Sequence, residues 1–192
     1  MRDTVSFFNN TTLSKGLVEL FIALEHRLKL DTPVKAYIGG GMAVHLYTGE
    51  RVTTDIDAEF TGRLAIPQDL VLDIKNDDGS TSPLYFDVNY NPMFALMHER
   101  YQDDAIELKI GTVQFQLWIL SPLDLAVSKL ARYASIDRED IAALAAKRYF
   151  TAAEFKERAT QALTGFIGGQ SMVQININEA CQIITAIESS DG

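Results

Sequence analysis

The most constraining feature of this sequence is a run of three glycines, Gly39–Gly41, placed between two apolar segments. Val34–Ile38 has the composition of a short buried strand, and Met42–Tyr47 has the apolar spacing of a helix start. A glycine turn between a strand and a helix removes side-chain bulk and leaves backbone N–H groups exposed. Such a turn suits phosphate oxygens. It is not a P-loop, because no Gly-Lys-Ser/Thr follows it.

Two aspartates follow the glycines in a segment with strand character. Residues 51–60 are rich in Val, Thr, Ile and Phe, and we predict a second strand there. Side chains two residues apart on a strand share a face, so Asp55 and Asp57 are expected close together. Two like charges held together favour a hard divalent cation such as Mg²⁺. Taken alone, Asp-Ile-Asp more often describes a solvated strand face. The preceding glycine turn favours instead a triphosphate bound between backbone amides and metal.

The rest of the chain changes from mixed to helical patterning near residue 120. We predict a helix over 12–30, a short helix over 67–75, a strand over 84–90 and a hairpin from 105–110 and 112–120, broken by Gly111. Four further helices are predicted, with Ser121, Asp137, Thr151 and Asn178 as the capping residues at which they begin. We therefore expect an α/β (α+β) fold, with a small mixed sheet flanked by helices over residues 1–120. A helical part over 121–192 would pack on it or continue the same domain.

Composition excludes several classes of function. The formal net charge of −9, from 17 basic and 26 acidic residues, disfavours non-specific binding to duplex DNA. The single cysteine, Cys181, excludes a disulfide framework and a cysteine-rich metal site. The three histidines are scattered, which gives little support to a zinc site or a Ser-His-Asp triad. No apolar run has the length of a membrane span and no signal-peptide core is present, so we predict a cytoplasmic protein.

The glycines and aspartates together resemble the polymerase-beta-like nucleotidyltransferase superfamily. Its signature is Gly-Gly, a short gap and then Asp-hydrophobic-Asp. The variant seen here, Gly-Gly-Met-Ala followed by Arg51-Val-Thr53-Thr-Asp55-Ile-Asp57, is similar to abortive-infection-type and lincosamide-type minimal nucleotidyltransferases. The abortive-infection branch also has a helix of the form K-L-x-R…R-D-x-x-D. Residues 128–141 resemble it, with an acid before the second arginine.

The resemblance implies transfer of a nucleoside monophosphate from an NTP to an acceptor, with Mg²⁺ or Mn²⁺ as cofactor and pyrophosphate as product. It assigns metal binding and catalysis to Asp55, Asp57 and a third carboxylate. Asp87, in Tyr-Phe-Asp-Val-Asn, is the best match for the third carboxylate, and Glu107 is the alternative. Asp87 would bind near the ions or act as base for an acceptor hydroxyl. The remaining matched residues are assigned to nucleotide binding: Gly39, Gly40, Gly41, Arg51, Thr53, Lys129 and Arg132.

For three residues, Lys129, Arg51 and His45, the sequence also supports a structural role in place of nucleotide binding or catalysis. Lys129 stands off the apolar stripe of its predicted helix, where a solvated lysine and a phosphate contact are equally supported. Arg51 has two acidic neighbours, Glu50 and Glu59, with which it would pair instead. His45 is close to the glycine turn, but a packed helix histidine describes it better than a catalytic base.

The acceptor stays open between a protein hydroxyl, an RNA 3′ end and a small molecule. The net charge favours a protein or a cationic small molecule, whereas the basic stretch over 129–158 keeps an RNA end in consideration. One form of the hypothesis is the toxin of a toxin–antitoxin pair, with a small antitoxin protein as partner. The alternative is a non-catalytic nucleotide-sensing or partner-binding module on the same fold, because a third glycine replaces the serine that many members have.

Overall fold

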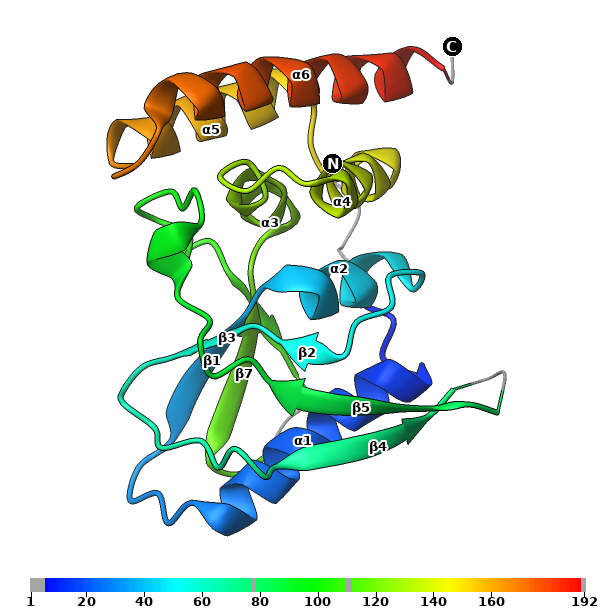
Figure 1. Ribbon diagram of the computed structural model, residues 1–192, viewed down its shortest axis with the longest axis vertical. Coiled ribbons are helices and arrows are strands. Elements are labelled where there is room, and N and C mark those ends of the chain that lie inside the picture. The colour runs from blue at the N-terminus through cyan, green and yellow to red at the C-terminus, as the bar shows by residue number, and fades with distance from the viewer. Residues whose placement is uncertain (1–5, 77–78, 110–111, 191–192) are drawn as a thin grey trace. The chain divides into compact units, whose positions relative to one another are not determined.

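Residues 6–76, 79–109 and 112–190 are described by a computed structural model, and they divide into two units (Figure 1). The α/β unit contains residues 7–90 and 105–119, and the helical unit contains residues 91–104 and 120–190 together with Ser6. The predicted mixed α/β fold flanked by helices is confirmed, with two small mixed sheets where one was expected. The predicted domain division at residue 120 stays a prediction.

The strand before the glycines is the centre of a four-stranded sheet in the α/β unit. Val34–Ile38 (β1) is a strand over the residues predicted from its composition. The sheet has the order β3-β1-β7-β6, with Ala58–Phe60 as β3, Ile106–Leu108 as β6 and Phe115–Ile119 as β7. Strand β7 is parallel to β1, whereas β3 and β6 are antiparallel to their neighbours. The predicted hairpin is confirmed as β6 and β7, although Gly111 lies outside the described residues.

A second, three-stranded sheet has the order β2-β5-β4. Its strands are Asp55–Ile56 (β2), Val71–Lys75 (β4) and Thr81–Phe86 (β5), with β2 parallel to β5 and β4 antiparallel to it. The prediction of a helix over 67–75 is therefore wrong. Leu72 and Ile74 turn inward between exposed neighbours, so the segment has the two-residue period of a strand.

The prediction of one strand over 51–60 is also wrong, because the chain changes sheets at Asp57. Before this residue, the carbonyls of Thr54 and Ile56 accept hydrogen bonds from Tyr85 and Asp87 N–H at 3.1 and 3.0 Å. At Asp57 the carbonyl accepts instead from Gly39 N–H at 2.9 Å. Strands β2 and β3 are consequently short and belong to different sheets. The strand predicted over 84–90 ends early, at Phe86.

One helix, Thr12–Arg27 (α1), joins the cores of the two sheets. Thr11 is its N-cap, and its buried stripe is made by Leu17, Leu20, Phe21 and Leu24. The Phe21 ring contacts Phe60 of β3, Phe86 of β5 and Phe115 of β7, with ring centroids 6.2, 5.0 and 5.3 Å away. The helix ends at Arg27, before the predicted end at residue 30, because Leu28 is already extended. Figure 1 shows α1 running along β4 and β5.

The helical unit has four helices among its described residues: Pro122–Ser128 (α3), Ser135–Ala146 (α4), Ala152–Thr164 (α5) and Gln170–Ser189 (α6). A 3-10 turn, Pro92–Phe94 (η1), precedes them. Ser121 and Thr151 are N-caps, as predicted. Asp137 is not the N-cap that was expected: the N-cap of α4 is Ala134, and Asp137 lies in the first turn, where its carboxylate accepts the Ala134 N–H at 2.9 Å.

The prediction that the final helix begins at Asn178 is wrong. Helix α6 begins at Gln170 after Gly169, and its buried residues Val173 and Ile177 already lie on the face continued by Ala180 and Ile184. Among the described residues, no helix combines the length and the apolar character needed to cross a membrane.

The aromatic contacts of Phe21 predict a large stability effect. Replacing Phe21 with Ala should lower the free energy of unfolding by about 4 kcal/mol, because it opens a cavity between two sheets and a helix. The matched control is Ile22→Ala on the same helix, where a side chain that is 41% exposed should cost within about 1 kcal/mol. Urea unfolding of both variants measures the difference. Equal losses would contradict a shared core built around Phe21.

Candidate functional site

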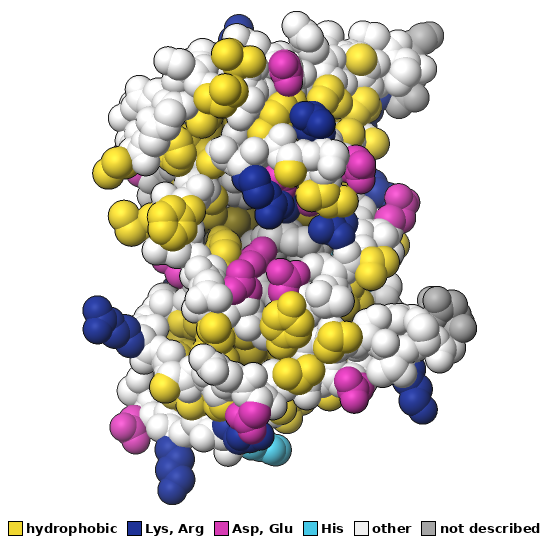
Figure 2. Space-filling view, viewed as in Figure 1, with side chains coloured by type: hydrophobic (Ala, Val, Ile, Leu, Met, Phe, Trp, Pro, Cys, Tyr) yellow, Lys and Arg dark blue, Asp and Glu magenta, His cyan; other side chains and the backbone are white. Residues whose placement is uncertain are grey.

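Three carboxylates meet in the α/β unit: Asp55 begins β2, and Asp57 and Asp87 directly follow β2 and β5. Asp55, Asp57 and Asp87 each offer one oxygen, and these oxygens all lie within 4.8 Å of one another. The parallel pairing of β2 with β5 causes this convergence, because it aligns Ile56 with Phe86 and so places the residues after them together. Acidic side chains gather in front of α2 and β2 in Figure 2. The alternative third carboxylate, Glu107, is exposed on β6 and is not part of this group.

The helix Gly40–Thr48 (α2) begins directly against one of these carboxylates. Gly40 has φ +57°, a left-handed conformation that side chains other than glycine rarely adopt. A Cβ atom at Gly40 would lie 1.7 Å from Asp57 Oδ2 and 2.6 Å from its Cγ. The first turn of α2 can approach Asp57 this closely only because residue 40 has no side chain.

The next glycine contacts the site through a threonine. A Cβ atom at Gly41 would lie 2.9 Å from Thr53 Oγ1 and 3.0 Å from Thr53 Cβ. The Thr53 hydroxyl donates a hydrogen bond of 2.6 Å to Asp55 Oδ1. Successive glycines of one helical turn therefore lie against Asp57 directly and against Asp55 through Thr53.

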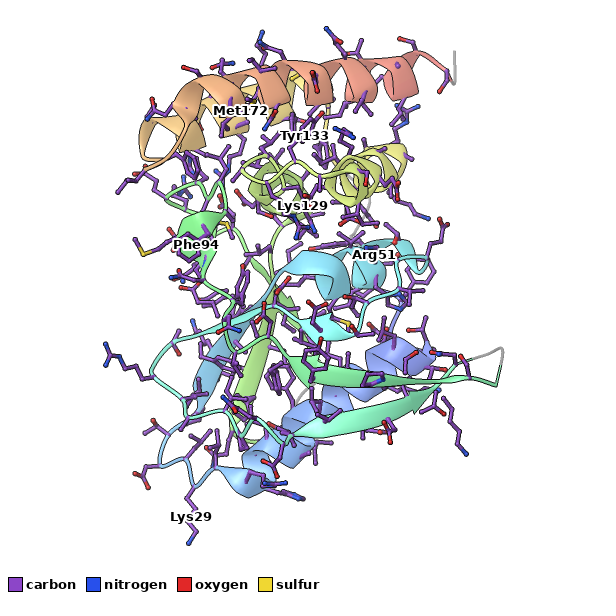
Figure 3. All side chains as sticks on the ribbon, in the orientation of Figure 1. Lys29, Arg51, Phe94, Lys129, Tyr133 and Met172 are labelled. Atoms are coloured by element: carbon purple, nitrogen blue, oxygen red, sulfur yellow. The ribbon has the colours of Figure 1, made fainter. Side chains whose placement is uncertain are left out.

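The same turn offers donors and positive charge. The first N–H groups of a helix have no intrahelical acceptor, and the N-cap Gly39 supplies no side chain to satisfy them. Arg51 Nη2 lies 3.5 Å from the position of a Cβ on Gly41, and its Nη1 donates to the Val52 carbonyl. Figure 3 shows Arg51 beside α2. Carboxylates able to hold a cation thus lie next to a helix start and a guanidinium able to hold an anion.

The remaining predicted residues, Lys129 and Arg132, belong to the helical unit. Lys129 is not solvated: its side chain is 8% exposed, and its Nζ lies 2.9 Å from Asp140 Oδ2 and 4.0 Å from Asp137 Oδ1. Arg132 donates to both oxygens of Asp137, at 2.8 and 2.6 Å. Burial would raise the pKa of Asp137, but the hydrogen bonds from Arg132 and the Ala134 N–H hold it below its usual value. A role of Lys129 and Arg132 toward a nucleotide stays a prediction.

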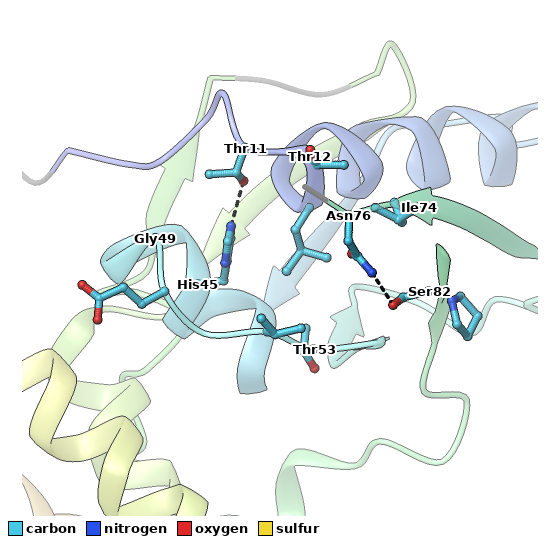
Figure 4. Close-up of a pocket in the computed structure, with 12 residues that line it drawn as sticks. Thr11, Thr12, His45, Gly49, Thr53, Ile74, Asn76 and Ser82 are labelled. Atoms are coloured by element: carbon cyan, nitrogen blue, oxygen red, sulfur yellow. Dashed lines mark hydrogen bonds between the residues drawn. The ribbon is translucent and has the colours of Figure 1, made fainter. Parts of the chain in front are cut away.

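His45 is a packed helix histidine, as predicted, but no sequence pattern indicated its hydrogen-bond partners. The ring is 6% exposed, its Nδ1 hydrogen-bonds the Arg51 carbonyl at 2.7 Å, and its Nε2 lies 2.7 Å from Thr11 Oγ1 (Figure 4). Because a carbonyl only accepts, Nδ1 carries the proton. Burial lowers the pKa of His45, and the Arg51 carbonyl opposes this only in part. A neutral His45 thus ties α2 and the start of α1 to the segment that carries Arg51 and Thr53.

Comparison with known proteins relates the chain to a protein family. The family model described as "Nucleotidyltransferase of unknown function" (DUF6036) matches residues 15–177, a range that includes the glycine turn and all three clustered aspartates. No curated protein sequence matches the chain, and no solved structure matches it.

The close approach of Gly40 to Asp57 predicts an unusual cost for one methyl group. Gly40→Ala should lower the free energy of unfolding by about 3 kcal/mol or more, from left-handed strain together with the clash. The control is Gly79→Ala, where φ is +83° and no atom of the described residues beyond the chain neighbours lies within 4 Å of the new methyl group, so strain alone should cost about 1 kcal/mol.

In an Asp57→Ala background the cost of Gly40→Ala should shrink, because the closest clashing atoms are gone. Urea unfolding of the four proteins of this cycle measures the coupling. Losses for Gly40→Ala and Gly79→Ala that agree within error would contradict the close approach.

The neutral state of His45 predicts a pH dependence of stability. Because the pKa of His45 is lowered in the folded protein, its contribution is complete above the unfolded value of 6.5 and is lost as the pH falls below that value. The loss is limited to about 1.4 kcal/mol per pH unit for one proton. Urea unfolding between about pH 8 and about pH 5 should show a shallower decline for His45→Gln than for the wild type. Parallel curves would contradict a buried neutral ring.

Proposed function

Because the chain belongs to the family of nucleotidyltransferases of unknown function (DUF6036), we propose that it moves a nucleoside monophosphate from an NTP to an acceptor. Asp55, Asp57 and Asp87 would hold Mg²⁺ or Mn²⁺, and Gly39–Gly41 with Arg51 would receive the phosphates. The single observation that carries the proposal is the convergence of three carboxylate oxygens within 4.8 Å beside the start of α2.

The carboxylate group fits a hard divalent cation on chemical grounds. Its donors are all oxygen atoms, the type that Mg²⁺ and Mn²⁺ prefer. Three negative charges in so small a space repel one another unless a cation neutralises them. When bound, such an ion neutralises phosphate charge and lowers the pKa of a coordinated hydroxyl.

The chain's own residues would bind and orient the substrates. The N–H groups at the start of α2 donate to the terminal phosphates, and Arg51 adds a positive charge beside them. The acceptor oxygen then bonds to the α-phosphorus while the bond to the β-phosphate oxygen breaks, and pyrophosphate leaves. Asp87, at the end of β5, is the proposed group for taking the proton of the acceptor hydroxyl. We propose Lys129 and Arg132 as further contacts of the triphosphate, on the sequence resemblance.

The finer assignment rests on the resemblance of residues 128–141 to the abortive-infection branch. It includes a role as the toxin of a toxin–antitoxin pair in the cytoplasm, with a small antitoxin protein as partner and a protein, RNA 3′ end or small molecule as acceptor. The competing hypothesis is a module that senses nucleotide without turnover. Both share the phosphate turn and differ in whether pyrophosphate is released.

The test is release of pyrophosphate from each of the four labelled NTPs with Mg²⁺ and a panel of the three acceptor classes. Asp57→Ala should reduce release to the level without protein, while its free energy of unfolding equals or exceeds that of the wild type because charge repulsion is relieved. Asp87→Asn should lose activity as well. Chelation of the divalent ion should have the same effect.

The matched control is Glu107→Gln, which removes an exposed carboxylate outside the group and should keep the wild-type rate. Loss in Glu107→Gln with retention in Asp87→Asn would reassign the third carboxylate. NTP binding without turnover for all acceptors would favour the sensing module. Activity per folded molecule retained in Asp57→Ala would contradict the proposed metal site.

A further inference from the structure

Thr53 lies between the glycine turn and the carboxylate group and contacts both. Its hydroxyl donates to Asp55 Oδ1 at 2.6 Å, and its Oγ1 and Cβ lie 2.9 and 3.0 Å from the position of a Cβ on Gly41. The sequence resemblance assigns Thr53 to nucleotide binding. We infer that Thr53 is instead a positioning residue, which fixes Asp55 for the divalent cation and connects that aspartate to the phosphate turn. The inference rests on the proposed function.

The hydrogen count of the threonine hydroxyl supports this role. A hydroxyl has one proton to donate, and an ionised carboxylate can only accept. While the Thr53 proton is donated to Asp55, it is not available for a phosphate oxygen, which also only accepts. A direct hydrogen bond from Thr53 to the nucleotide would therefore require the loss of the one to Asp55.

The packing of Thr53 makes it a stiff support. Its β-branched side chain has few rotamers, and the close contact with Gly41 restricts movement away from Asp55. The hydrogen bond holds Asp55 in one orientation, which is the usual effect of a group that supports a metal ligand. A shift of the first turn of α2 would therefore displace Asp55 through Thr53 and would displace Asp57 through its contact with Gly40.

The experiment measures Mn²⁺ binding to the whole chain without nucleotide, by the electron paramagnetic resonance signal of free Mn²⁺. We expect Thr53→Val, which keeps the shape and removes the proton, to weaken Mn²⁺ binding by about tenfold. Thr53→Ser should restore affinity to within about threefold of the wild type, because the donor returns. Asp55→Asn reports the loss of the ligand itself.

The matched control is Thr54→Val, the same change at the adjacent residue, whose backbone carbonyl pairs with the Tyr85 N–H. It should bind Mn²⁺ as the wild type does. Thermal unfolding of each variant verifies the fold, and Thr53→Ala, which removes the hydroxyl with less bulk at the Gly41 contact, replaces Thr53→Val if that variant does not fold.

The outcomes separate this inference from the proposed function. Wild-type Mn²⁺ affinity in Thr53→Val, with weakened affinity in Asp55→Asn, overturns the positioning role and leaves the nucleotidyltransferase proposal standing. Weakened NTP binding in Thr53→Val with unchanged Mn²⁺ affinity overturns the inference in favour of a direct nucleotide contact. Equal losses in Thr53→Val and Thr53→Ser also overturn it, because the hydroxyl is then not responsible. A wild-type protein that binds no Mn²⁺ overturns the metal site and this inference together.

Discussion

The close contact between Gly40 and Asp57 is the constraint on which the arrangement of the site depends. A helix start normally keeps a side chain's width between its backbone and a neighbouring strand. Here the missing Cβ lets the first turn of α2 lie directly against a carboxylate. A negative side chain and the partial positive charge of a helix N-terminus attract each other. Their closeness here places groups able to bind a cation and groups able to bind an anion side by side. The contact therefore places the carboxylates proposed to hold a cation next to the helix N–H groups proposed to receive a phosphate.

The sequence predicted which residues lie together in the candidate site better than it predicted the strand pairing that brings them together. The strand before the glycines, the turn and the aspartate pair follow local rules of spacing and composition, which a single sequence carries. The reason why Asp55 and Asp57 converge was different from the one expected. They do not lie on one continuous strand, because the backbone pairs with β5 before Asp57 and with the β1 side from Asp57 onward. Such a change of sheet depends on which strands pair, and pairing over long sequence separations leaves no local pattern.

Other differences between the sequence predictions and the structure also have physical causes. Residues 71–75 are apolar at Val71, Leu72 and Ile74, a spacing too short to distinguish a helix turn from a strand, and pairing with β5 decides for the strand. The role of His45 depends on Thr11 and on the Arg51 carbonyl, so neither partner could be identified from spacing. For Lys129, which stands off the apolar stripe of its helix, the sequence supported a solvated lysine and a phosphate contact equally. The carboxylates that bury it, Asp137 and Asp140, come from the next helix.

The most direct measurement is a crystal structure of the protein with Mn²⁺ and a non-hydrolysable NTP analogue, with the ion located by its anomalous scattering. We predict an anomalous peak bound by Asp55, Asp57 and Asp87, and a triphosphate whose terminal oxygens accept hydrogen bonds from the N–H groups of Gly40 and Gly41. A triphosphate bound away from the start of α2, or Mn²⁺ bound by other residues while these three aspartates remain without it, would contradict the account.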